Sequence, residues 1–229
     1  MTTTPSPWAV AGLRLRTGDL TLRPVVEADL DTLGALLPAD VELDPSIPKP
    51  FGLEPGPARA VAIRQQYWRR LAGWTPTGWT LEFAVLRGTD LLGTQALEAR
   101  DFAVLRTVET ASWLAPGARG RGVGKAMRTA VLALAFDGLG AEVAHTSAWA
   151  DNAASLGVSR ALGYGPNGTV RAVRIGGPHS PDPGTGVSDD MPGMRLDAHG
   201  WRTRPRPAVE VAGLDECRAW FGATIRSQA

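Results

Sequence analysis

Arg119-Gly120-Arg121-Gly122-Val123-Gly124-Lys125 is the stretch of this sequence that decides the fold. A run with strand character precedes it, and apolar residues recur at helical spacing after it, for example Met127, Val131 and Leu134. Successive glycines let backbone N–H groups converge on an anion, and the following helix adds its free N-terminal donors and the positive end of its dipole. The stretch therefore predicts a strand, a pyrophosphate-binding turn and a helix.

Two better-known phosphate turns do not fit this stretch. A nucleotide P-loop needs glycine where Arg119 stands and Ser or Thr where Ala126 stands. A dinucleotide fingerprint starting at Gly120 needs a third glycine at Lys125 and a βαβ repeat around it. What remains is R-x-x-G-x-G, spelled by Arg119, Gly122 and Gly124, with a glycine-rich connection that binds nothing as the alternative.

Hydrophobic alternation and turn formers predict the other elements. Strands are expected in residues 13–24 (two strands around a turn), 79–86, 91–98, 108–114, 142–148, 169–175 and 194–198. Helices are expected in residues 27–37, 58–71, from the glycine-rich turn to about 138, and 152–162, with a short strand and helix in 209–221. The proline-rich segment 38–57 is expected to be a loop, either a cover for a site or an ordinary connector. Segment 177–193 is expected to be a mobile excursion, either a substrate lid or simple disorder.

Two flanking segments add to the evidence of the turn. Glu109-Thr-Ala-Ser-Trp113-Leu114 precedes it, and Asp151-Asn152-Ala-Ala-Ser155 leads to Leu162-Gly163-Tyr164 after it. In order and spacing these segments resemble the GNAT superfamily of N-acyltransferases over about residues 20–201. The resemblance is closest to the ribosomal-protein N-acetyltransferase branch, and more narrowly to an actinobacterial GNAT succinyltransferase.

The resemblance implies the fold class and the domain organisation. The fold is α+β with α/β/α layers, in which helices flank a mixed, mostly antiparallel central sheet. One acyltransferase domain occupies residues 1–229, with its core at about 11–203 and a C-terminal strand and helix extension at 204–229.

The resemblance also implies acetyl-CoA or succinyl-CoA as the cofactor. The backbone of Trp113 and Leu114 would align the pantetheine arm, and Asn152 and Ser155 would contact it near the thioester. The pyrophosphate would be held by Arg119, Gly120, Arg121, Gly122, Val123, Gly124 and Lys125.

Glu109 is the predicted general base. An amine of pKa ~10.4 is protonated at neutral pH and must lose a proton before it attacks a thioester. The alternative for Glu109 is a structural ion pair with Arg106 or Arg128.

The general acid is less clearly marked. Many relatives carry a tyrosine near position 159, where this chain has Ser159, and its only tyrosines are Tyr67 and Tyr164. Ser155 is therefore the first candidate for the acid and Ser159 the second, with water as a third source of the proton.

The acceptor is expected to be a small-molecule or peptide amine, recognised by Asp101, Phe102 and Trp149. Three rival functions stay open: self-protective acylation of an amine-bearing antibiotic, modification of exposed protein amines, and a non-catalytic acyl-CoA-binding module. The sequence does not choose between acetyl and succinyl.

Composition limits the remaining possibilities. The 24 basic and 23 acidic residues leave a net charge of +1, which argues against nucleic acid as a partner. One cysteine excludes an internal disulfide, and three dispersed histidines argue against a metal site. No apolar run approaches the ~18 residues of a membrane span. We expect no membrane association, a cytoplasmic location and a homodimer.

Overall fold

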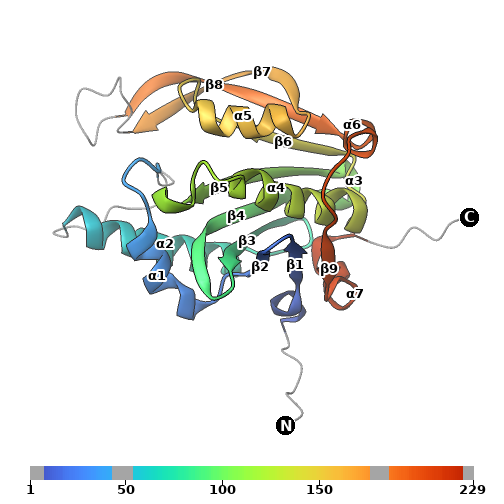
Figure 1. The fold of residues 1–229 in the computed structure, drawn as a ribbon, viewed down its shortest axis with the longest axis horizontal. Helices are drawn as coiled ribbons and strands as arrows, with labels where there is room; N and C mark the ends of the chain where they lie inside the picture. The colour runs from blue at the N-terminus through green and yellow to red at the C-terminus, as the bar shows by residue number, and fades with distance from the viewer. Residues whose placement is uncertain (1–7, 43–53, 176–185, 224–229) are drawn as a thin grey trace, which may run out of the picture.

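A sheet of nine strands forms the centre of the protein (Figure 1). The computed structural model describes residues 8–42, 54–175 and 186–223. Across the sheet the strand order is β7-β8-β6-β5-β4-β3-β2-β1-β9. The strands are β1 (Arg14–Thr17), β2 (Leu20–Pro24), β3 (Gly78–Arg87), β4 (Asp90–Arg100), β5 (Thr107–Leu114), β6 (Val143–Ser147), β7 (Gly165–Ile175), β8 (Gly186–Asp197) and β9 (Glu210–Ala212).

Helices lie on both faces of this sheet. The α-helices are α1 (Leu30–Leu36), α2 (Pro55–Ala72), α3 (Phe102–Leu105), α4 (Val123–Ala133), α5 (Ala153–Ala161), α6 (Ala198–Thr203) and α7 (Leu214–Cys217). A π turn, η4 (Leu134–Gly138), continues α4, and the 3-10 turns are η1 (Ala9–Gly12), η2 (Glu27–Asp29), η3 (Pro116–Ala118) and η5 (Arg218–Phe221). Every strand pair is antiparallel except β5 with β6. The predicted fold class, a mixed and mostly antiparallel sheet flanked by helices, is confirmed.

Strand alternation distributes side chains between two cores. On β3, Leu81 and Phe83 enter the main core, which also holds the buried side of α4. Ala84 points the other way, into a smaller core with Leu33 of α1 and Ile63 of α2. Residues on the central strands therefore face either α4 and α5 or α1 and α2, and this division places the site.

Several predicted boundaries were wrong; for example, the strand expected at 169–175 is β7 and begins at Gly165. Helix α2 starts at Pro55 and not at 58, because proline suits the first turn of a helix, where its missing N–H costs nothing. Residues 186–193 belong to strand β8, although the sequence suggested an excursion across 177–193. Pro192 is tolerated there because it lies at an irregularity in the pairing with β7.

The predicted strand 194–198 ends at Asp197, whose carboxylate accepts a hydrogen bond from Gly200 N–H and caps α6. The rest of the predicted excursion, 177–185, and most of the predicted loop 38–57 lie outside the described residues.

The C-terminal part joins the same sheet and core. Strand β9 pairs with β1, and Phe221 is fully buried against Trp79, with ring centroids 4.9 Å apart. Trp74 Nε1 donates to the carbonyl of Trp220 (2.9 Å) and Trp79 Nε1 to that of Phe221 (3.2 Å). Residues 210–221 therefore complete the aromatic end of the main core.

Candidate active site

Strands β5 and β6 separate part of the way along their length, as the ribbons in Figure 1 show. They pair at Thr107↔Val143, Val108↔Ala144 and Glu109↔His145, and their pairing stops there. Beyond this point the Thr146 hydroxyl donates to the carbonyl of Thr110 (3.1 Å). No described strand pairs with residues 111–114 on this edge of β5, so their backbone groups are suited to bind an extended ligand.

The glycine-rich turn lies at the open end of this split. Gly120 and Gly122 have φ of +71° and +78°, a region that favours glycine, and a Cβ at either position would meet nothing within 4 Å. The first hydrogen bond of α4 runs from Ala126 N–H to the Gly122 carbonyl, so the N–H groups of residues 123–125 precede it without helical acceptors. Residues 119–122 and Lys125 are exposed. Free donors, open space and basic side chains fit a pyrophosphate.

Arg119 is held in place beside the turn. Its guanidinium donates to both carboxylate oxygens of Asp40 (2.6 and 2.9 Å), and its Nε donates to the carbonyl of Leu114 (3.0 Å). The hydrogen bonds from Arg119 lower the pKa of Asp40 below its usual value. Asp40 therefore remains ionised and offsets one positive charge close to the turn.

The predicted arm-binding residues form the start of α5. Asn152 caps the helix, since its Oδ1 accepts a hydrogen bond from Ser155 N–H (3.0 Å). The Ser155 carbonyl in turn accepts from the Ser159 hydroxyl (3.0 Å). Ser159 also accepts a hydrogen bond from Arg128 of α4 (2.8 Å). Ser159, the second candidate for the acid, is thus buried and its hydroxyl proton is engaged.

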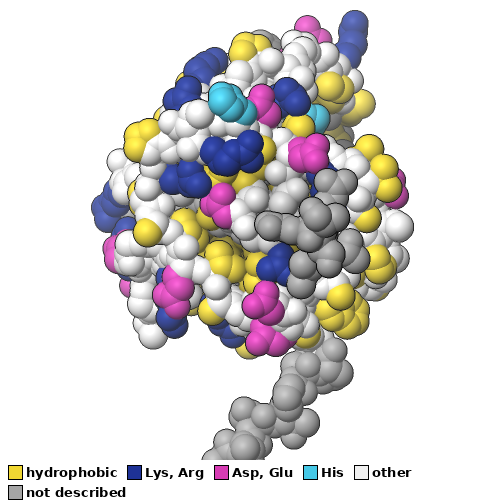
Figure 2. Space-filling model, turned by 90° about the vertical axis from the view of Figure 1, so that its right-hand side faces the viewer, with side chains coloured by type: hydrophobic (Ala, Val, Ile, Leu, Met, Phe, Trp, Pro, Cys, Tyr) yellow, Lys and Arg dark blue, Asp and Glu magenta, His cyan; other side chains and the backbone are white. Residues whose placement is uncertain are grey.

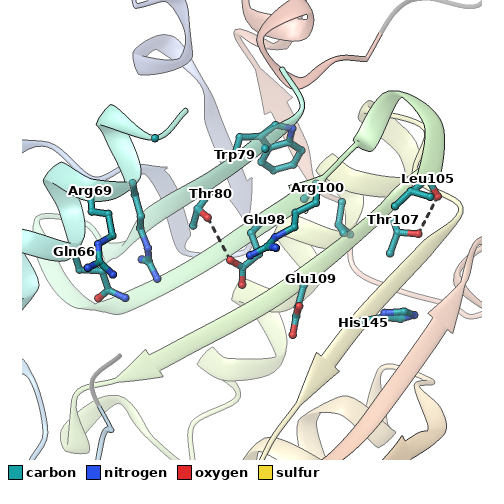
Figure 3. A pocket seen from close by; sticks show the side chains of 15 residues that line it. Gln66, Arg69, Trp79, Thr80, Glu98, Arg100, Leu105, Thr107, Glu109 and His145 are labelled. Atoms are coloured by element: carbon teal, nitrogen blue, oxygen red, sulfur yellow. Dashed lines mark hydrogen bonds between the residues drawn. The ribbon is translucent and has the colours of Figure 1, made fainter. Parts of the chain in front are cut away.

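A cavity of about 670 Å³ lies on the α2 side of the sheet, at the closed end of the split. Figure 3 shows Glu98 of β4, Glu109 of β5 and His145 of β6 along neighbouring strands, with Gln66 and Arg69 of α2 facing them. Glu98 and Glu109 are directly opposite each other in the β4–β5 register. The cavity therefore contains an adjacent pair of carboxylates.

The surroundings shift two of these groups. Burial, followed by the charge of Glu109, raises the pKa of Glu98, although Thr80 donates a hydrogen bond to it (3.3 Å). Burial, followed by the charge of Arg195, lowers the pKa of His145. Glu98 thus holds a proton to a higher pH than an ordinary glutamate, and His145 is neutral at physiological pH. A site with these groups can accept a proton and bind an amine.

The structural alternative for Glu109 was wrong. Among the ion pairs of the described residues, none joins Glu109 to Arg106 or Arg128. Arg106 lies over the ring of Phe102, 5.4 Å from its centroid, and Arg128 binds serines. Glu109 keeps a carboxylate that faces the cavity.

The three predicted acceptor contacts lie elsewhere. Phe102 is fully buried and packs against Trp79, so its side chain belongs to the core and cannot reach a substrate. Asp101 is exposed at a left-handed backbone position next to α3. Trp149 donates from its Nε1 to Glu42 (2.8 Å) and stacks under Arg174. None of the three lines the cavity.

Glu98, Arg100 and His145 line the cavity and were missed by the sequence reasoning. The register of an antiparallel pair was the available signal for Glu98, because strands at 91–98 and 108–114 put it close to Glu109. No comparable signal marks His145, whose place depends on the parallel pairing of β6 with β5.

The remaining surface agrees with the mixed composition. Basic and acidic side chains are interspersed over the face drawn in Figure 2. Within the described ranges, no helix has the length and apolarity needed to cross a bilayer. The same residues contain no cluster of three or more His, Cys, Asp or Glu side chains suited to a metal ion.

Comparison with known proteins agrees with this geometry. The sequence pattern of the acetyltransferase (GNAT) domain family matches residues 19–165. The fold is similar to that of Mycobacterium smegmatis RimJ in complex with CoA-disulfide, with a TM-score of 0.65, 16% identity, and coverage of 92% of this chain and 95% of that one. It is also similar to spermidine N-acetyltransferase from Vibrio cholerae in complex with CoA and spermine, with a TM-score of 0.58, 16% identity, and coverage of 80% and 98%.

The family pattern spans well over half of the chain and includes the split strands, the turn and the helix that follows Asn152. The chain therefore belongs to the GNAT family of acyl-CoA-dependent N-acyltransferases.

Proposed function

We propose that this protein transfers an acetyl or succinyl group from acyl-CoA to a primary amine of a small molecule or peptide, by direct attack of the amine on the thioester. One observation carries the proposal: the glycine-rich turn and a pair of carboxylates lie at opposite ends of the same split between β5 and β6. The similar structures with bound CoA, CoA-disulfide and spermine support this choice of donor and of acceptor class.

The donor would be held by three parts of the chain. The N–H groups of residues 122–125, with the side chains of Arg121 and Lys125, would hold the pyrophosphate. The unpaired edge at Trp113 and Leu114 would hold the pantetheine arm as an added strand. Asn152 and Ser155 would contact the arm near the thioester. When bound, acyl-CoA supplies the thioester carbon that the amine attacks.

Glu109 is the proposed base. It lies at the closed end of the split and faces the cavity from which an amine would approach. Glu98 beside it would hold the amine by a hydrogen bond or charge, and His145 offers a neutral imidazole on the next strand. Glu98, Arg100 and His145 replace the three residues that sequence reasoning assigned to acceptor binding.

The cavity lining bears on the rival functions. Arg69, Arg70 and Arg100 line it together with Glu98 and Glu109, so its charge is mixed. A polycationic antibiotic is best attracted by an acidic cleft, and this lining does not favour it. A non-catalytic acyl-CoA module has no use for a pair of carboxylates at the closed end of the split. The cytoplasmic location and the homodimer stay predictions.

Release of free CoA thiol from acetyl-CoA and succinyl-CoA with a panel of amines tests the proposal. With saturating amine, Glu109→Gln should lower kcat by about 10²–10⁴-fold, the usual contribution of a general base. Glu210→Gln, on the exposed edge strand β9, is the matched control and should leave kcat unchanged. Normal turnover by Glu109→Gln would remove the catalytic role. Absence of heat on titration with CoA would overturn the donor site itself.

A further inference from the structure

Arg128 is a buried cation that has no carboxylate partner among the described residues. Only 4% of the residue is exposed, and burial lowers the pKa of its guanidinium. Its Nη1 donates to the Ser159 hydroxyl (2.8 Å) and its Nη2 to the Ser112 hydroxyl (3.2 Å). Its Nε has no hydrogen-bond partner among the described residues. The guanidinium therefore carries a full charge and unused donors in the interior.

Arg174 shows how this chain otherwise buries an arginine. Its guanidinium forms ion pairs with Glu42 (3.0 Å), Asp151 (3.0 Å) and Asp189 (3.1 Å). No such pair is formed by Arg128 within the described part of the chain. A buried charge costs free energy unless an opposite charge offsets it. Arg128 can thus receive an anion that the described residues do not provide.

The two serines locate Arg128 in the split. Ser112 lies on the unpaired edge of β5 and is solvent-exposed, and Ser159 lies on α5. Through these two hydroxyls Arg128 connects strand β5 with helix α5, on the face of the sheet opposite Glu109. Because Asn152 and Ser155 begin the same helix α5, Arg128 lies where the thioester end of the donor is proposed to bind.

Neither tyrosine of the chain matches the expected position of the acid. By the resemblance, many relatives carry a tyrosine near position 159, where this chain has Ser159. Tyr164 is the nearest tyrosine in sequence, but burial raises its pKa to about 12, even though the nearby charge of Arg128 acts to lower it. Without a tyrosine acid, stabilisation of the thiolate by a cation is an alternative to its protonation by Ser155 or by water.

We propose that Arg128 is a positioning residue that acts through the Ser112 hydroxyl and stabilises the thiolate of coenzyme A as it leaves, in place of a protonating tyrosine. This inference rests on the proposed function. The amine nitrogen forms a bond to the thioester carbon, the carbon–sulfur bond breaks, and its electron pair stays on sulfur as a thiolate. The amine proton passes to Glu109, and water later protonates the released thiolate.

The hydrogen bonds around Arg128 support this division of roles. A guanidinium does not give up its proton at neutral pH, so it acts by charge and not as an acid. Ser159 directs its own proton to the Ser155 carbonyl, whereas the Ser112 hydroxyl donates in none of the hydrogen bonds of the described residues. Ser112 is therefore free to donate to the sulfur while it accepts from Arg128, which polarises it.

The test measures the thiol pKa of bound CoA as well as turnover. In the wild-type protein, titration of the thiolate absorbance should give a pKa at least about one unit below that of free CoA, because a nearby cation favours the charged form. Arg128→Met should remove this shift and lower kcat by about 10²–10³-fold with acetyl-CoA and succinyl-CoA alike, a loss like that of an oxyanion donor. Arg128→Lys should restore part of the thiol pKa shift and part of kcat. Arg160→Met, on the exposed side of α5, is the control and should change neither.

Each outcome decides the proposal. An unshifted thiol pKa in wild-type complexes overturns it, and this measurement needs no variant to fold. Retained kcat in folded Arg128→Met also overturns it. A loss of kcat confined to succinyl-CoA also overturns the proposal, because Arg128 would then bind the carboxylate of the succinyl group. Failure of the proposed function would look different, because the wild-type protein would then bind no CoA or release no thiol.

Discussion

Glu98 is expected to lower the stability of the fold at neutral pH, because its pKa is raised by burial and by Glu109. The unfolded chain has the ordinary glutamate pKa of about 4.3, so the contribution of Glu98 to stability is present below that pH and is lost as the pH rises through the folded-state pKa. Glu98→Gln removes this loss. We expect its Tm to exceed that of the wild type by about 2 °C or more at pH 7 and to match it near pH 4. Equal Tm values at pH 7, by calorimetry at both pH values, would show that Glu98 ionises freely.

Asp40 is expected to weaken the binding of CoA. It neutralises Arg119 beside the turn, and both side chains are partly exposed. Asp40→Asn should therefore tighten CoA binding by about two- to fivefold, with the gain reduced at high salt. Calorimetric titration of CoA at two salt concentrations measures this. Asp31→Asn, which removes an exposed carboxylate from α1, is the control and should leave the dissociation constant unchanged. Weaker binding by Asp40→Asn would mean that Asp40 positions Arg119 instead of competing for it.

At the scale of elements, local signals predicted most of the fold. The alternation in 79–86 and 91–98 and the helix spacing after Gly124 are confirmed by β3, β4 and α4, because each depends on neighbours in sequence. The strand predicted at 194–198 was shorter than β8, because Pro192 and several glycines indicate a loop. Pairing with β7 and β6 stabilises the longer strand. The partners of Arg128 and of Trp149 likewise depend on long-range packing that periodicity cannot encode.

The start of α4 is expected to depend on the backbone conformation of Gly122. At φ of +78° a side chain is strained by about 1–2 kcal/mol, even though a Cβ would meet no atom within 4 Å. Gly122→Ala should lower the free energy of unfolding by that amount and weaken CoA binding by about tenfold or more, which corresponds to 1.4 kcal/mol. Urea unfolding and calorimetry measure the two effects. Gly117→Ala, in η3 with open space and an ordinary φ, should change neither. Unaltered CoA binding by Gly122→Ala would argue against the turn as the pyrophosphate site.

At the scale of the whole molecule, the two faces of one sheet carry the two halves of the proposed reaction. Glu109 faces the cavity beside α2, whereas Ser112 faces α4 and Arg128, and both residues lie on β5. Alternation along a single strand thus separates proton acceptance from stabilisation of the leaving group. In the proposed complex, the split between β5 and β6 lets the two sides meet at one thioester.

The C-terminal extension should unfold together with the rest of the chain, since Phe221 is fully buried against Trp74 and Trp79. Phe221→Ala removes a large core side chain and should lower the free energy of unfolding by about 3–5 kcal/mol in a single transition. Urea unfolding followed by tryptophan fluorescence and by circular dichroism should give coincident curves. Val104→Ala, at an 81% exposed position of α3, should stay within about 0.5 kcal/mol of the wild type. Two separate transitions, or a loss below about 1 kcal/mol for Phe221→Ala, would make residues 204–229 an independent module instead of part of one domain.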